Sequence, residues 1–266
     1  MSQRLRQRIE QSIRSGKKLL SLFVTAGFPD PELTVDIILA CDKAGVDFIE
    51  LGMPFSDPIA DGPVIQKASD IALQKGMTIN RILNMVKTVR NQSSIPIILM
   101  GYVNPVFQTG FESFFTRCAE AGVDGLILPD WPPEESAKFA NLLNNHDLDL
   151  IHLIAPNTPL ERIKQIDRQS KAFVYCTAYT GVTGKDSHSS NGMTSFLSML
   201  RKHLNNPFLV GFGIKSAEDF NYYSGFSAGC IVGSAFIKTI ENIAQPEIDE
   251  KVKEFVHRIR YGPETD

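Results

Sequence analysis

The sequence has few cysteines and no recognisable metal-ligand spacing. Its five histidines form no pair at the distances typical of metal ligands, so we expect no metal site. A zinc ribbon and a thioredoxin-type redox centre are also excluded, because no C-x-x-C motif occurs. We expect buried, reduced thiols at all four cysteines, which are far apart and each in an apolar segment: Cys41, Cys118, Cys176 and Cys230.

Long hydrophobic runs and a strong net charge are missing as well. No segment approaches the roughly 18 apolar residues that a membrane-spanning helix needs, and the charged amino terminus lacks the apolar core of a secretory signal. Lys and Arg number 27 against 30 Asp and Glu, a net charge of −3, which gives no global attraction to nucleic acid or to anionic membranes. We therefore expect a soluble, cytoplasmic protein that binds any anion through a local site.

The 266 residues instead show a regular alternation of short apolar runs and longer helix-period segments. Eight runs are rich in Val, Ile and Leu, which is typical of parallel strands buried on both faces. The predicted strands are Leu19–Ala26, Phe48–Met53, Pro96–Tyr102, Gly125–Asp130, Asp149–Ala155, Ala172–Thr177, Phe208–Ile214 and Gly229–Ser234.

The segments between these runs have the pattern of amphipathic helices. Leu33, Ile37 and Cys41 fall on one helical face, and that segment ends at Gly45, a residue favoured just past a helix C-terminus. KAGVDFIELG and EAGVDGLILPD are near copies, as a repeated helix–turn–strand unit requires. The repetition predicts the α/β class and a (β/α)8 TIM barrel, formed by residues 1–266 as a single domain with an extra N-terminal helix. A doubly wound open sheet is the alternative.

Two carboxylates follow the second predicted strand, at the end of the barrel where active sites lie. Glu50 stands within the apolar strand of the segment IELGMPFSDPIADG, and Asp61 lies in the Pro- and Gly-rich loop after it. Whether Glu50 points into the barrel or outward under the helices, burial should raise the pKa of its carboxyl group. A raised pKa suits a proton shuttle near neutral pH; the alternative is a structural carboxyl group with hydrogen-bond partners.

Glycines after the last two predicted strands indicate a site for an anion. Gly211–Ile214 reads GFGI, and Gly233–Ala235 reads GSA at the start of the last helical segments. Such backbone can approach a phosphate group closely and donate N–H groups to it. The long polar loop 178–192 is typical of a mobile lid. Trp131, Phe55 and Phe107 stand on predicted loops, where they line a ligand pocket or form a patch that another subunit covers.

Several motifs together resemble the family of tryptophan synthase alpha subunits. IELGMPFSDPIADG matches the family's signature segment, and FVTAGFPDP, MGYVNPVF, LPDWPPEES, APNTP, GVTG, GFGI and VGSA follow in the family's order over nearly the whole chain. The resemblance implies a lyase that cleaves indole-3-glycerol phosphate to indole and glyceraldehyde 3-phosphate without a metal or a Schiff base. It assigns the catalytic role to Glu50 and Asp61.

The resemblance also implies a substrate pocket, a partner and a docking surface. The partner is a beta subunit that carries pyridoxal phosphate, in an α2β2 tetramer, and no cofactor belongs to this chain. The implied substrate-binding residues are Phe23, Met100, Ile127, Leu153, Tyr175, Thr183, Gly184, Phe212, Gly213, Gly233 and Ser234. The implied docking residues are Pro54, Phe55, Asp57, Asn104, Pro105, Trp131 and Pro132.

The chain departs from the family beside the lid motif, where Ala178 replaces a common Ser and Tyr179 replaces smaller or basic residues. Both changes bear on lid closure and leave the two carboxylates untouched. Two alternative functions stay open. One is a catalytically silent subunit that only activates a beta partner. The other is a Schiff-base aldolase with Lys215 as nucleophile, although we expect Lys215 to lie outside any apolar pocket.

Overall fold

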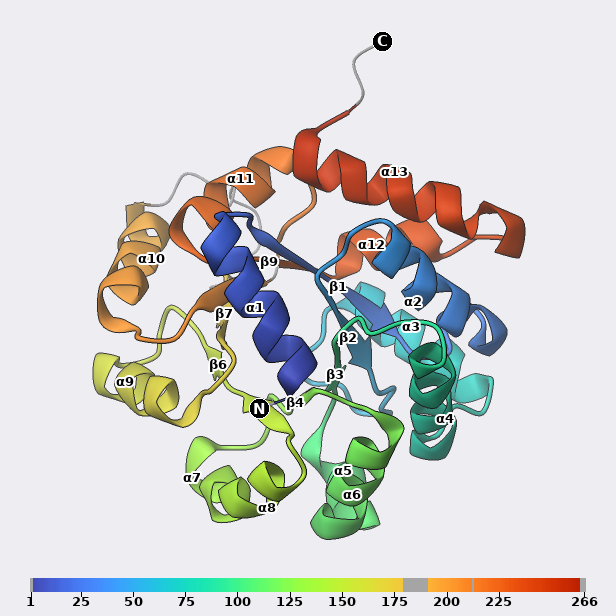
Figure 1. Ribbon diagram of the computed structural model, residues 1–266, viewed down its shortest axis with the longest axis horizontal. Helices are drawn as coiled ribbons and strands as arrows, with labels where there is room; N and C mark the ends of the chain where they lie inside the picture. Colours follow the sequence, from blue (N-terminus) through green and yellow to red (C-terminus); the bar gives the residue numbers. More distant parts are fainter. Residues whose placement is uncertain (1, 179–190, 212, 264–266) are drawn as a thin grey trace.

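The structure is a computed structural model that describes residues 2–178, 191–211 and 213–263 (Figure 1). Its strands form one sheet in the order β5-β4-β3-β2-β1-β9-β8-β7-β6, and all paired neighbours are parallel. The strands are β1 (Leu19–Thr25), β2 (Phe48–Gly52), β3 (Ile97–Met100), β4 (Gly125–Ile127), β5 (Asp149–Ile151), β6 (Leu153–Ile154), β7 (Val174–Thr177), β8 (Phe208–Gly211) and β9 (Gly229–Val232).

The two ends of this sheet are halves of one strand, which is interrupted at His152. Its first half, β5, pairs with β4, and its second half, β6, pairs with β7. The sheet therefore closes into a barrel of eight strands around a common axis. The predicted (β/α)8 barrel is confirmed, with each predicted strand in place and only the fifth one interrupted.

Helices surround the barrel on all sides (Figure 1). They are α1 (Gln3–Ser15), α2 (Thr34–Lys43), α3 (Pro63–Gln74), α4 (Ile79–Arg90), α5 (Val103–Thr109), α6 (Phe111–Ala121), α7 (Pro133–Ser136), α8 (Ala140–Asn145), α9 (Leu160–Gln169), α10 (Asn191–His203), α11 (Ala217–Phe226), α12 (Ser234–Ile240) and α13 (Ile248–Tyr261), with short 3-10 turns at Pro31–Leu33, Ala137–Phe139 and Gln245–Glu247.

The hydrophobic core has two layers, because each strand buries side chains on both faces. Every residue of β1 is buried, since alternate side chains enter the barrel or pack beneath the helices. Helix α6 shows the matching pattern, with Phe114, Phe115 and Cys118 on its buried face. All four cysteines are buried and free, as the sequence predicts.

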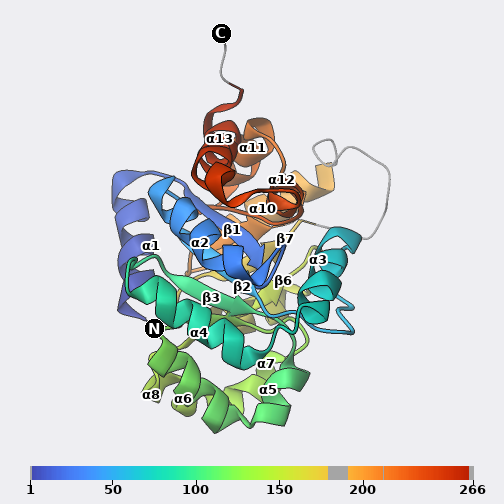
Figure 2. The ribbon, with the colours of Figure 1, turned by 90° about the vertical axis from the view of Figure 1, so that its right-hand side faces the viewer.

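The predicted extra N-terminal helix, α1, lies across the amino-terminal end of the barrel (Figure 1). It is fixed there by Asp124, whose carboxylate accepts hydrogen bonds from Arg4 Nε (2.9 Å), Arg90 Nη2 (2.8 Å), the Ile97 N–H (2.8 Å) and the Ser2 hydroxyl. In the side view α1 and α3 occupy opposite ends of the barrel (Figure 2). Ligands therefore have access from the α3 end, where the carboxyl ends of the strands lie.

Within the described ranges, no helix is long and apolar enough to cross a membrane. The same residues contain no group of three or more His, Cys, Asp and Glu side chains that could hold a metal ion.

Candidate active site

Glu50 points into the barrel. It lies between Phe23 of β1 and Ile98 of β3 in the sheet register and lines the same cavity as Phe23. The side chain is fully buried, and neither carboxylate oxygen has a hydrogen-bond partner among the described residues. Burial raises the pKa of Glu50 from 4.5 to about 8. Near neutral pH this carboxyl group is therefore largely protonated and holds a proton that it can donate.

Asp61 lies in the loop between β2 and α3 and is partly buried. Tyr102 lies just after β3. Its hydroxyl donates a hydrogen bond to Asp61 Oδ2 (3.1 Å) and accepts one from the Ala60 N–H (2.9 Å). The Gln66 side chain donates to the Asp61 carbonyl (2.9 Å) from the first turns of α3. Burial raises the pKa of Asp61, and the hydrogen bond from Tyr102 opposes that rise. These contacts hold the Asp61 carboxylate in one place beside the barrel opening.

A cavity of about 550 Å³, here called the central cavity, joins both carboxylates to the anion site predicted from the glycines. Eight of the predicted site residues line it: Phe23, Glu50, Asp61, Met100, Tyr175, Gly213, Gly233 and Ser234. Ile127 and Leu153 are not among the lining residues; Ile127 is buried within β4 and Leu153 is half-buried in β6. Thr183, Gly184 and Phe212 lie outside the described residues, as does Tyr179 of the lid loop.

Two glycines make room for the aromatic wall of the central cavity. A Cβ atom on Gly52 would collide with the Phe23 ring, and one on Gly211 would collide with the Tyr175 ring and hydroxyl. The Phe23 and Tyr175 rings can therefore approach the ends of β2 and β8 only because those positions lack side chains. The pKa of Tyr175 is raised well above its usual value, first by burial and then by the negative charges of Glu50 and Asp61. Its hydroxyl is neutral.

Three cationic side chains line the central cavity on the side of the two glycine turns. Lys215 follows Gly213, Lys238 lies one helical turn after Ser234, and Arg258 comes from α13. None of the three forms an ion pair with a carboxylate in the described part of the chain. Lys215 lines the cavity, but its side chain is exposed, so no apolar pocket encloses it.

Sequence reasoning missed Lys238, Arg258 and Tyr102. The i, i+4 spacing from Ser234 could have indicated Lys238, because both residues lie on one face of α12. Nothing local indicates Arg258, since α13 reaches the cavity through the fold alone. Tyr102 ends the predicted third strand, and the pairing of β2 with β3 brings its hydroxyl to Asp61 in the loop after β2.

Apolar side chains are exposed near the same end of the barrel. Ile59, in the loop with Asp61, is 86% exposed, and Phe107 at the end of α5 is 68% exposed. Trp131 does not line the central cavity; its side chain is buried, and its ring stacks on that of Phe111 at 4.9 Å between ring centres. The neighbouring predicted docking residues Asp57, Asn104 and Pro132 are exposed, and Pro54, Phe55 and Pro105 are partly exposed.

The sequence of this chain is similar to those of known proteins. The family described as "Tryptophan synthase alpha chain" matches residues 9–261. The tryptophan synthase alpha chain of Christiangramia forsetii is 44% identical over 248 residues, which cover 92% of this chain and 97% of the relative. That of Flavobacterium psychrophilum is 42% identical over 249 residues, covering 93% and 98%.

Solved structures agree with the sequence relatives. The structure of tryptophan synthase subunit alpha from Legionella pneumophila str. Paris is similar, with a TM-score of 0.88 at 34% identity, covering 98% of each chain. A structure of Mycobacterium tuberculosis tryptophan synthase has a TM-score of 0.87 at 29% identity, covering 98% of this chain and 100% of that one. The likeness therefore extends over the whole barrel and both sides of the central cavity.

Proposed function

This chain belongs to the family of tryptophan synthase alpha chains, and we propose that Glu50 and Asp61 perform its acid–base chemistry. It is a lyase that cleaves indole-3-glycerol phosphate to indole and glyceraldehyde 3-phosphate in tryptophan biosynthesis. The observation that carries the proposal is Glu50 itself, a fully buried carboxyl group that faces the central cavity without a hydrogen-bond partner among the described residues.

The reaction needs a proton at indole C3 before the carbon–carbon bond can break. Protonated Glu50 donates that proton, and Asp61 accepts the proton of the ring nitrogen, which leaves a neutral tautomer with a C2=N1 double bond. The Glu50 carboxylate then takes the proton of the adjacent glycerol hydroxyl. The new carbonyl forms, the electrons of the broken bond return to the ring, and Asp61 gives its proton back to N1. Both carboxyl groups finish as they began.

The two environments suit these two roles. Glu50, with a pKa of about 8, is largely protonated near pH 7 and can start as the acid. Asp61 accepts a hydrogen bond from Tyr102, which stabilises the ionised form that the role of base requires. Phe23, Met100 and Tyr175 supply the apolar and aromatic surface that holds the indole ring and the glycerol chain between the carboxylates.

The phosphate group lies at the other side of the central cavity. The backbone at Gly213, Gly233 and Ser234 donates N–H groups to it, together with Gly184. Lys238 and Arg258 add positive charge beside this backbone. The substrate thus lies with its reacting carbon at the carboxylates and its dianionic phosphate at the unpaired cations. Thr183 and Phe212 also contact the substrate in this proposal, whereas Ile127 and Leu153 do not line the central cavity.

Membership of the family implies a beta-subunit partner. The further assignments are an α2β2 assembly, pyridoxal phosphate in the partner subunit, a cytoplasmic location and one domain over residues 1–266. The docking surface combines the exposed Ile59 and Phe107 with the neighbouring residues Pro54, Phe55, Asp57, Asn104, Pro105, Trp131 and Pro132. Exposed apolar side chains on loops near a cavity mouth are typical of a surface that a partner covers.

Substitution of the two carboxylates tests the proposed roles. We expect Glu50→Gln and Asp61→Asn each to lower kcat for indole release by about 10³-fold, because each removes one proton-transfer step. Asp70→Asn, an exposed position on α3, is the matched control. Turnover is measured with and without beta subunit, and circular dichroism checks the fold.

Either carboxylate variant with near-normal turnover would contradict the assigned role. Borohydride trapping tests the Schiff-base alternative directly. An adduct on Lys215 in the presence of an aldehyde product would replace the acid–base proposal, and we expect none.

A further inference from the structure

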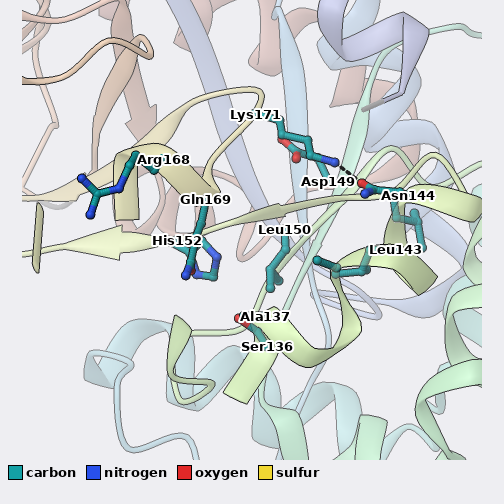
Figure 3. A pocket seen from close by; sticks show the side chains of 12 residues that line it. Ser136, Ala137, Leu143, Asn144, Asp149, Leu150, His152, Arg168, Gln169 and Lys171 are labelled. Carbon is teal, nitrogen blue, oxygen red and sulfur yellow. Dashed lines mark hydrogen bonds between the residues drawn. The ribbon is translucent and has the colours of Figure 1, made fainter. Parts of the chain in front are cut away.

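Outside the central cavity, the structure has a second cavity and the loop that follows β2. The second cavity, about 280 Å³ on the outer flank of the barrel, shares no lining residue with the central cavity (Figure 3). Its lining comes from the interrupted strand and from α7, α8 and α9, so it contains neither catalytic carboxylate. The loop after β2, by contrast, carries Asp61 together with exposed residues of the docking surface. A residue outside the central cavity can therefore act on Asp61 most directly from this loop.

Tyr102 anchors the loop that carries Asp61. Its hydroxyl accepts the Ala60 N–H (2.9 Å) and donates to Asp61 Oδ2 (3.1 Å). Among the described residues, no other group from outside residues 54–66 forms a hydrogen bond with residues 54–61. The Asp61 carboxylate accepts no second hydrogen bond in the same part of the chain. Its position therefore depends on where the Tyr102 hydroxyl is held.

Two contacts fix Tyr102 itself. The N–H of Val103, the next residue, donates to Asp130 Oδ1 (2.9 Å) and Oδ2 (3.2 Å), which holds the backbone. The Tyr102 ring lies against the Phe55 ring, with 5.2 Å between ring centres and 30° between ring planes, a separation at which aromatic rings attract each other. Tyr102 is buried, whereas Phe55 is partly exposed. Phe55 is therefore the outer support of the Tyr102 ring.

The sheet register explains why these two rings meet. The Met53 N–H donates to the Met100 carbonyl (2.7 Å), which continues the pairing of β2 with β3 by one residue. Phe55 and Tyr102 each lie two residues after that pair, so the two segments leave the sheet side by side. A Cβ atom on Gly101 would lie 2.8 Å from Met53 Cε, so the glycine allows the two segments to approach each other.

We propose that Phe55 is a positioning residue: its ring holds the Tyr102 ring, and the Tyr102 hydroxyl then holds the Asp61 carboxylate at the opening of the central cavity. Phe55 does not line that cavity, so it acts only through Tyr102. This role rests on the proposed function of Asp61 as the base. A base must lie within hydrogen-bond reach of the proton that it removes, so a loose Tyr102 ring lowers kcat. The KM changes little, because the phosphate group lies at the other side of the cavity.

Phe55→Leu tests this role, because leucine keeps an apolar side chain and removes the ring face. We expect kcat for indole release to fall about fivefold and KM for indole-3-glycerol phosphate to stay within about twofold. A weaker bond from Tyr102 stabilises ionised Asp61 less, so the pKa of Asp61 rises. The acidic limb of the kcat/KM profile should then move to higher pH by about half a unit. Phe55→Tyr keeps the ring and should keep the wild-type kcat and profile.

The double variant Phe55→Leu, Tyr102→Phe decides whether Phe55 acts through the hydroxyl. Its kcat and pH profile should match those of Tyr102→Phe alone, because the hydroxyl that Phe55 holds is already absent. All variants are measured as the full chain, alone and with saturating beta subunit, and circular dichroism checks the fold.

Phe107→Leu is the matched control, since it makes the same substitution on the same docking surface. The Phe107 ring contacts Phe111 and not Tyr102, so the acidic limb should stay where it is. Weaker docking would appear in Phe55→Leu and Phe107→Leu alike, as a higher concentration of beta subunit at half-maximal activity.

An unmoved acidic limb in Phe55→Leu, or effects that add in the double variant, would overturn the inference. Two further variants show how far such a failure extends. If the limb moves in Tyr102→Phe but not in Phe55→Leu, only the role of Phe55 is wrong. Near-normal turnover in Asp61→Asn would instead contradict the proposed function of Asp61, and the role of Phe55 with it.

Discussion

Glu50 and Asp124 are both fully buried carboxylates, but the two regions that contain them treat the charge in opposite ways. Asp124, at the amino-terminal end of the barrel, accepts hydrogen bonds from two arginines, a backbone N–H and the Ser2 hydroxyl. Glu50 faces the central cavity and has no partner among the described residues. A buried carboxylate with partners fixes structure, whereas one without partners keeps its proton and can transfer it.

The same contrast appears within a single strand region. Asp47, three residues before Glu50, accepts the Leu20 N–H (2.9 Å) and a bond from Arg260 (2.8 Å). The cationic side chains show the same contrast between paired and unpaired charges. Arg4, Arg90 and Arg260 are paired at the amino-terminal end, while the cations of the central cavity have no carboxylate partner in the described residues. Burial alone therefore does not identify the reactive end of this barrel; the pairing of charges does.

The largest effect on stability should come from the pH dependence that Glu50 imposes. The folded protein keeps the Glu50 proton up to about pH 8, whereas an ordinary glutamate loses it near 4.5. Between these values the folded state binds more protons, so the free energy of unfolding falls as pH rises. We expect wild type to lose roughly 4 kcal/mol more than Glu50→Gln between pH 5 and pH 8 in urea titrations. If the free energy of unfolding changes equally with pH in wild type and in Glu50→Gln, then Glu50 does not retain its proton in the folded state. The proposed contrast between Glu50 and Asp124 would then be wrong.

Substitution at the paired end should affect stability and spare catalysis. Asp124→Asn leaves Arg90, whose side chain is 14% exposed, without its charge partner, so we expect a loss of about 3 kcal/mol in the free energy of unfolding. The kcat of the folded fraction should stay within twofold, because Asp124 lies at the far end of the barrel. Arg14→Gln, which breaks an exposed pair with Glu10, is the control and should cost less than about 1 kcal/mol. A large loss of kcat in Asp124→Asn would contradict the separation of the two ends.

The unpaired cations should affect substrate binding more than turnover. We expect the double variant Lys238→Gln, Arg258→Gln to raise KM for indole-3-glycerol phosphate about tenfold, since two charges near the phosphate are lost. The kcat should change less than twofold, and added salt should reduce the difference from wild type. Lys253→Gln, an exposed position on the same helix as Arg258, serves as the control. A changed kcat with an unchanged KM would place these cations in a different role.

The smallest effect should follow from Tyr102→Phe, which removes one hydrogen bond from Asp61 while keeping the ring. We expect kcat to fall about fivefold, because the bond contributes roughly 1 kcal/mol. Without the donor the pKa of Asp61 rises further, so the acidic limb of the kcat/KM profile should move to higher pH. Tyr261→Phe, an exposed position, tests for a general effect of losing a hydroxyl. An unmoved pH profile would show that Tyr102 does not act through Asp61.

The fold was predictable because its signals are local. Each strand has an apolar run, and glycines such as Gly122 end helices in the left-handed conformation that the sequence predicts. The interruption of the fifth strand was not predictable, because His152 follows Leu150 and Ile151 in an apolar run with no break signal.

The site was predictable where the sequence itself breaks a pattern. Glu50 stands out because a carboxylate interrupts an apolar strand, yet the strand pattern could not decide whether it faces inward. Glu50 has no hydrogen-bond partner among the described residues because its neighbours on the adjacent strands, Phe23 and Ile98, have apolar side chains. Arg258 could not be found at all, since its role depends on where α13 meets the barrel.

The interrupted strand at His152 also divides the chain into two half-barrels. The first half, up to β5, contains Glu50 and Asp61, and the second half, from β6 onward, contains Gly213 and Gly233. A molecule that spans the central cavity therefore contacts residues of both halves. Its binding free energy opposes the separation of the two halves, so a bound substrate stabilises the closed barrel.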